Sequence, residues 1–155
     1  MSRTHRAALQ FLLMIIAVAA PAAYAADIKV HIDDTTVARG ENIAGAAAFI
    51  VRLDQPVPKG SVITIDWETV DGTATAKVDY VAGKGSIKIN PNDGKMNVLV
   101  VVPLITGRAA ARKCAFSVKF KAFITGAHSV TVDNQAGKAK ATIFKDTTRV
   151  APRAS

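Results

Sequence analysis

A repeated alternation of apolar and polar residues is the feature that most restricts how this chain can fold. The pattern appears in residues 28–33, 63–68 and 116–121, and a further run places Phe49, Val51 and Leu53 on one face. A period of two places successive side chains on opposite faces of a β-strand, so one face can be buried while the other meets water. Clusters of Gly, Pro, Asn and Asp separate these runs, and no amphipathic helical stretch lies between them. The pattern predicts a two-sheet antiparallel β-sandwich of about seven strands.

Three segments allow finer predictions. Trp67 ends a clear alternating run and is expected in the core. Residues 98–102 are apolar at every position, which predicts a central strand covered on both faces. Pro91-Asn92-Asp93-Gly94 separates that strand from the run before it and predicts a turn.

The first residues have the layout of a cleaved signal peptide. Arg3 and Arg6 precede an uncharged apolar run, Phe11–Ala20, which is followed by the small-residue pattern Ala23-Tyr24-Ala25. An uncleaved membrane anchor is the alternative, but the apolar run is short for a span and ends in Pro-Ala-Ala. We therefore expect cleavage near Ala25 and a secreted or periplasmic protein without a transmembrane segment.

The chain accordingly divides into three parts. Residues 1–25 are the expected signal peptide and 26–146 one β-sandwich domain. Residues 147–155 are a tail without an apolar period, which we expect to be disordered. Cys114 is the only cysteine, so an exported domain would have no internal disulfide. We interpret Cys114 as a small strand residue, with disulfide-linked dimerisation or a reactive thiol as the alternatives.

Charge is distributed unevenly along the chain. The formal net charge is +8, and loss of Arg3 and Arg6 with the signal peptide lowers it to +6. Acidic residues outnumber basic ones in 26–83, whereas basic residues predominate in 84–155. Anionic partners are therefore conceivable.

One segment resembles the signature of the Calx-beta domain family, in which a strand leads into D-G-T-A-x-x-x-x-D-Y. The resemblance spans about residues 27–146 and implies an immunoglobulin-like β-sandwich. The matching residues are Ile63–Tyr80 with Asp71-Gly72-Thr73-Ala74 and Asp79-Tyr80, Gly85–Ile89, Val100–Gly107, Phe116-Ser117-Val118 and Ala141-Thr142-Ile143.

The resemblance also implies a calcium site at one end of the sandwich, built from loop carboxylates, but the sequence departs from that pattern. Cations stand where the family has acidic residues, at Arg39 and in the run 108–113, and they would repel a divalent cation. We expect no cofactor and no high-affinity calcium site; a weak residual site would use Glu41, Asp71, Asp79 and Asp146. The alternative for Asp71 and Asp79 is a structural role in holding a loop.

The same cations suggest an anion-binding or partner-binding surface. One group is expected at one end of the sandwich and consists of Arg39, Arg108, Arg112, Lys113 and Lys145. The other group lies on two strands that are usually neighbours in such folds and consists of Lys119, Lys121, Lys138 and Lys140. The alternative is that exposed lysines only keep strands soluble and block edge pairing. The sequence does not identify a partner. If the surface binds one, an anionic envelope component or an acidic protein is expected rather than nucleic acid, because most aromatic residues are assigned to the core.

Catalysis finds little support in the sequence. His31 and His128 are the only histidines after the signal peptide, and no nucleophile, phosphate-binding or zinc motif is present. The carboxylates of Asp66 and Glu68 are interpreted as solvated positions on a strand. The sequence favours a non-enzymatic binding or structural module. The alternatives are a calcium-binding adhesion or surface-organisation module, and a basic accessory or inhibitor domain that docks on an acidic partner.

Overall fold

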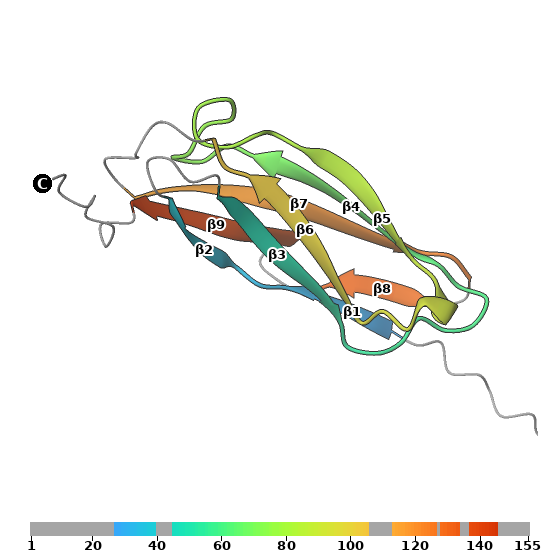
Figure 1. Ribbon diagram of the computed structural model, residues 1–155. Coiled ribbons are helices and arrows are strands. Elements are labelled where there is room, and N and C mark those ends of the chain that lie inside the picture. Colours follow the sequence, from blue (N-terminus) through green and yellow to red (C-terminus); the bar gives the residue numbers. More distant parts are fainter. Residues whose placement is uncertain (1–26, 40–44, 106–112, 127, 134–136, 146–155) are drawn as a thin grey trace, which may run out of the picture.

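A computed structural model describes residues 27–39, 45–105, 113–126, 128–133 and 137–145 (Figure 1). The predicted signal peptide and the tail 147–155 lie outside these residues. Within the described part of the chain the strands are β1 (Asp27–Ile32), β2 (Thr35–Arg39), β3 (Ala46–Leu53), β4 (Ile63–Val70), β5 (Lys84–Ile89), β6 (Asn97–Pro103), β7 (Cys114–Ile124), β8 (Ser129–Val132) and β9 (Lys138–Lys145). A short 3-10 turn, η1 (Pro91–Asp93), followed by Gly94 at φ 59°, confirms the predicted turn.

The strands form two sheets that pack face to face. One sheet has the order β6-β3-β1-β8 and the other β2-β9-β7-β4-β5. Most neighbours are antiparallel, but β1 pairs with β8 and β2 with β9 in parallel. The predicted immunoglobulin-like sandwich is confirmed, with β2 and β8 as short additional strands.

The first stretch of the domain crosses from one sheet to the other and forms both parallel pairs. β1 belongs to the four-stranded sheet and β2 to the five-stranded sheet, and Asp33 and Asp34 lie between them. The Lys140 backbone N–H donates to Asp34 Oδ1 at 2.7 Å, and Arg52 Nη2 lies 2.6 Å from Asp33 Oδ2. The two aspartates therefore hold the crossing to both sheets.

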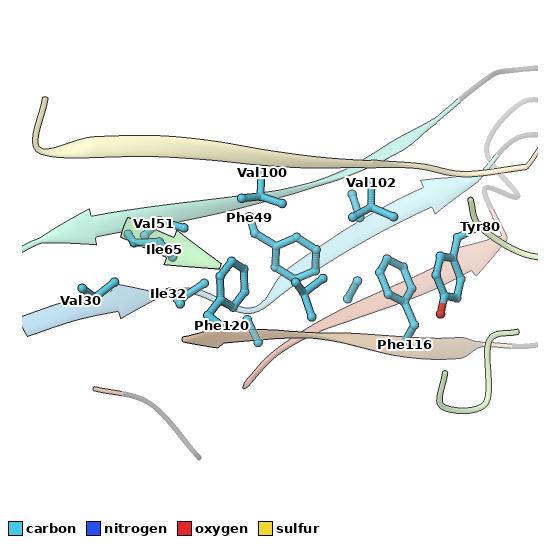
Figure 2. Close-up of a cluster of buried hydrophobic side chains, with 14 of the residues drawn as sticks. Val30, Ile32, Phe49, Val51, Ile65, Tyr80, Val100, Val102, Phe116 and Phe120 are labelled. Carbon is cyan, nitrogen blue, oxygen red and sulfur yellow. The ribbon is translucent and has the colours of Figure 1, made fainter. Parts of the chain in front are cut away.

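Aromatic rings from both sheets meet in the core (Figure 2). Phe49 of β3 contacts Phe116 and Phe120 of β7 edge-on, with ring centroids 6.2 and 6.3 Å apart. Tyr80 stacks on Phe116 at 4.1 Å and closes one end of this row. Cys114 is buried at the start of β7, as expected of a small strand residue.

Trp67 packs against the core, as predicted, but it is only partly buried. Trp67 shares the inward face of β4 with Ile65, but it is only half-buried because it lies beside β5, at the edge of its sheet. Its ring covers Gly83 and Gly85, where an added β-carbon would lie 3.1 and 3.0 Å from the ring. Glycine at these positions makes room for the indole.

The prediction that residues 98–102 form a central strand is wrong. These residues belong to β6, which is one of the two edge strands of the four-stranded sheet. Val100 and Val102 point into the core, whereas Leu99 and Val101 are 55% and 47% exposed on the outer face. A continuous apolar run does not distinguish a strand covered on both faces from an edge strand with an apolar outer face.

Candidate functional site

The loop that carries the D-G-T-A-x-x-x-x-D-Y pattern is closed by Asp71. Its Oδ1 accepts hydrogen bonds from the Tyr80 hydroxyl and from the Ala76 backbone N–H, the latter at 2.9 Å. These two hydrogen bonds, led by that of Tyr80, lower the pKa of Asp71 below its usual value. Burial of Tyr80, reinforced by the hydrogen bond to Asp71, raises the pKa of its phenol to about 12. Asp71 therefore serves to anchor a core tyrosine.

The residues after Asp71 attach the loop to the start of β7. Ala74 N–H donates to the Ala115 carbonyl at 2.8 Å, and Ala115 N–H donates to Thr73 Oγ1 at 2.9 Å. A β-carbon on Gly72 would lie 2.5 Å from the Ala115 carbonyl oxygen, so only glycine fits. Ala74 itself is fully buried. The D-G-T-A pattern is thus explained by backbone docking.

Asp79 also binds backbone within the loop. Its Oδ2 accepts a hydrogen bond from Thr75 N–H at 3.0 Å, across the bend in which Lys77 has a positive φ of 67°. Among the described residues no group of three His, Cys, Asp or Glu side chains could hold a metal ion. Glu41 and Asp146 lie outside those residues, so the weak calcium site stays a prediction.

The lysines predicted to share one surface lie on neighbouring strands. β7 and β9 are antiparallel partners, with Lys119 opposite Lys138 and Ser117 opposite Lys140. Directly opposed residues point to the same side of a sheet. Lys121 lies two residues beyond Lys119 and shares its face. The four lysines therefore lie on the outer face of the five-stranded sheet.

A groove of about 830 Å³ crosses this outer face. Asp66 and Glu68 of β4 lie along it, opposite Lys121 and Lys119 of β7 on one side and Ser86 and Lys84 of β5 on the other. The full lining is Asp66, Trp67, Glu68, Lys84, Gly85, Ser86, Lys119, Phe120, Lys121, Gly137 and Lys138. The groove thus combines a central column of carboxylates with lysines on both sides.

The contacts inside this groove are those of a solvated surface. Lys119 Nζ lies 3.8 Å from Glu68 Oε1, and both side chains are about half exposed. Ser86 Oγ donates to Asp66 Oδ1, and Lys121 Nζ lies 4.9 Å from the centre of the Phe123 ring. Exposed ion pairs of this kind contribute little to stability. The groove side chains can therefore exchange these contacts for a ligand at low cost.

Sequence reasoning missed the contribution of β4 and β5 to this groove. Asp66 and Glu68 were interpreted as solvated residues only, and Lys84 and Ser86 were not singled out. The alternation of Lys84, Ser86 and Lys88 was the available signal, because it places three polar side chains on one face. What the sequence lacked was the order of strands that sets β5 beside β4.

Of the second group of predicted cations, the structure describes the backbone positions of Arg39, Lys113 and Lys145, at or next to the ends of β2, β7 and β9. Arg39 at the end of β2 is the register partner of Lys145 at the end of β9. Lys113 directly precedes β7, whose first residue Cys114 is opposite Ile143. Arg108 and Arg112 lie outside the described residues.

Comparison with known proteins identifies the fold. The chain is 20% identical to an apo structure of the Calx CBD1 domain, with a TM-score of 0.57 over 77% of this chain and 98% of that one. The chain has a Calx-beta-like fold. The Calx CBD2 domain gives 12% identity and a TM-score of 0.58 over 77% and 88% of the two chains.

A structure of CBD12 from CALX1.2 gives 21% identity and a TM-score of 0.60. The match covers 76% of this chain and 44% of that longer one. No family model and no curated protein matches the sequence. Throughout the described ranges, no helix is long and apolar enough to cross a membrane.

Proposed function

We propose that this chain is an exported, non-enzymatic binding module that takes an anionic partner rich in carboxylates on the outer face of its five-stranded sheet. The observation that carries the proposal is the groove with lysines on both sides. Strands are about 5 Å apart, so the lysines of β5 and β7 flank the carboxylates of β4 at roughly 10 Å from one another. The arrangement suits an extended ligand lying along the groove.

The mixed charge of the groove supports a ligand with both acceptors and donors. Lys84, Lys119, Lys121 and Lys138 bind carboxylates through charge-assisted hydrogen bonds. Asp66 and Glu68 accept hydrogen bonds from ligand hydroxyl or amide groups. An acidic polysaccharide and an acidic protein segment share this chemistry.

A calcium-dependent function is the second candidate, because a structure of similar fold is described as a calcium binding domain, CBD12 of CALX1.1. For this chain we propose that no high-affinity calcium site forms. Asp71 Oδ1 already accepts two hydrogen bonds, and Asp79 Oδ2 accepts a third. The exposed cation Lys113 lies two residues before Ala115, on which the same loop docks. A bound Ca²⁺ would have to displace the hydrogen bonds to Asp71 and Asp79 and would be repelled by the charge of Lys113.

Binding of residues 26–155 to polyglutamate and to polygalacturonate, measured by calorimetry at low and moderate salt, tests the groove. We expect binding that weakens steeply as salt rises. The triple variant Lys119→Gln, Lys121→Gln, Lys138→Gln should bind at least about tenfold more weakly, which corresponds to about 1.4 kcal/mol. Tighter binding of polyglutamate would indicate an acidic protein segment as the ligand of the groove, and tighter binding of polygalacturonate an acidic polysaccharide.

A matched control separates the groove from net charge. Lys29→Gln, Lys59→Gln, Lys95→Gln removes the same charge at exposed positions outside the groove lining. This control variant should bind within about twofold of the unmodified protein. An equal loss of affinity in the two triple variants would show that binding is non-specific charge attraction and would contradict a binding groove.

A further inference from the structure

The edge strand β6 presents an apolar outer face that nothing in the described structure covers. Leu99 is 55% exposed and Val101 is 47% exposed, although both lie in the middle of a strand. Ile50, opposite Leu99 on β3, is 39% exposed and widens the patch. Soluble proteins usually protect such edges with charges, prolines or bulges, because an unpaired apolar strand is a template for another strand.

The backbone of the same two residues points away from the sheet. Leu53 N–H donates to the Met96 carbonyl at 2.8 Å, and Leu104 N–H donates to the Gly45 carbonyl at 2.8 Å. Because hydrogen bonding alternates along an antiparallel pair, the even-numbered residues of β6 bind β3. The N–H and C=O groups of Leu99 and Val101 therefore face the open edge.

The open edge ends at Pro103. Its carbonyl also points outward and accepts a hydrogen bond from Val81 N–H at 2.9 Å. Proline has no N–H, so pairing with a further strand cannot continue past this position. The available edge is thus limited to the stretch from Asn97 to Val101.

We propose that a second copy of this chain pairs with β6 through this edge, antiparallel about a two-fold axis. Leu99 would face the partner's Val101, and Val101 the partner's Leu99, so that their backbones exchange four hydrogen bonds. A two-fold interface is self-complementary, and here each copy offers the same two donors, two acceptors and apolar side chains. The result is a continuous eight-stranded sheet.

Charge favours this edge over the edges of the other sheet. No residue from Asn97 to Pro103 is charged, so two copies of β6 meet without repulsion between them. The two edge strands of the five-stranded sheet are charged, because β5 has Lys84 and Lys88 and β2 ends at Arg39. The lysine-rich groove belongs to that other sheet, so pairing through β6 leaves it open. The dimer is independent of whether the groove binds anions.

The mass of residues 26–155, measured by sedimentation or light scattering from about 1 to about 200 μM, tests the proposal. We expect a reversible monomer–dimer equilibrium. Val101→Pro removes the outward N–H without adding charge and should give a monomer across this range, because proline is tolerated at an open strand edge. Val101→Ile keeps the N–H and the apolar face, and should remain dimeric.

A second pair of variants distinguishes loss of pairing from loss of folding. Leu99→Lys places a charge at an exposed position of the pairing edge and should also give a monomer, with the melting midpoint that the unmodified protein has at low concentration, where both are monomeric. Ile50→Lys changes the same outer face one strand away and should retain the dimer. A monomeric unmodified protein at the highest concentration would overturn the proposal. So would a dimer that survives both Val101→Pro and Leu99→Lys, or one that Ile50→Lys alone disrupts.

Discussion

The loop from Asp71 to Tyr80 and the groove on the five-stranded sheet both contain carboxylates, but those carboxylates have different surroundings. In the loop, Asp71 and Asp79 accept hydrogen bonds from backbone N–H groups and from Tyr80. In the groove, Asp66 and Glu68 lie between outward lysine and serine side chains of β7 and β5. The first pair holds the loop together through hydrogen bonds within the chain, whereas the second pair contacts side chains on a sheet surface and is available to a ligand.

This contrast separates resemblance from function. The D-G-T-A and D-Y residues that resemble a known family bind the loop to β7 and to the core. The residues that we propose for binding are outward positions of β4, β5, β7 and β9, and they are not part of that signature. The D-G-T-A and D-Y pattern therefore indicates the fold. Substitutions in the loop should change stability, and substitutions in the groove should change binding.

The largest expected effect is on stability and comes from the loop. Gly72→Val would place a β-carbon 2.5 Å from the Ala115 carbonyl oxygen. We expect a loss of about 2–3 kcal/mol in the free energy of unfolding, measured by urea denaturation, because the loop must move off β7. Gly94→Asn is the control, since Gly94 has open space around it and asparagine tolerates its positive φ. Equal stability of both variants would show that the loop does not dock on β7.

A smaller effect is expected from the hydroxyl of Tyr80. Tyr80→Phe keeps the ring stacked on Phe116 but removes the hydrogen bond to Asp71. We expect a loss of about 1 kcal/mol in the free energy of unfolding at neutral pH, with unchanged affinity of the groove for polyglutamate. A large loss of affinity for polyglutamate without a loss in the free energy of unfolding would indicate that the ligand binds at the loop.

The pH dependence of the same residue can be read directly. Tyr80 is the only tyrosine after residue 26, so its ionisation can be followed by ultraviolet absorbance. Its pKa is raised from 10.0 to about 12 in the folded protein. The neutral phenol therefore stabilises the fold fully below pH 10, and this contribution is lost as the pH rises toward 12. A titration midpoint near 10 in the folded protein would contradict the burial of this hydroxyl.

The sequence predicted the two-sheet sandwich because burial imposes a strict period of two on most strands. The alternation in β1, β4 and β7 could be recognised without any knowledge of their neighbours. β2 and β8 were not recognised because they are only five and four residues long. Runs this short give too few residues to establish a period.

Strand order could not be predicted from periodicity, and the errors follow from this. β6 was predicted to be a central strand because its side chains are apolar on both faces, yet it pairs with only one neighbouring strand, β3. Trp67 was placed in the core because its run alternates correctly, yet it lies beside the edge strand β5. The neighbourhood of β7 and β9 was expected from the family resemblance, and it brings Lys119 and Lys138 together.

The smallest expected effect is that of calcium on stability. An ion that binds only the folded state raises the melting midpoint by mass action. We expect residues 26–155 to melt at the same temperature in chelator and in millimolar calcium, because the loop carboxylates already bind N–H and O–H donors. A rise of several degrees that magnesium does not reproduce would restore a calcium site at the loop.

Amide chemical shifts recorded by NMR during a titration with polyglutamate test the central claim most directly. We expect shifts in outward residues of β4, β5, β7 and β9 around Glu68 and Lys119, which saturate together and disappear at high salt. The loop from Asp71 to Tyr80 should stay unperturbed. Shifts concentrated in that loop, or spread evenly over all exposed lysines, would contradict a binding groove on the five-stranded sheet.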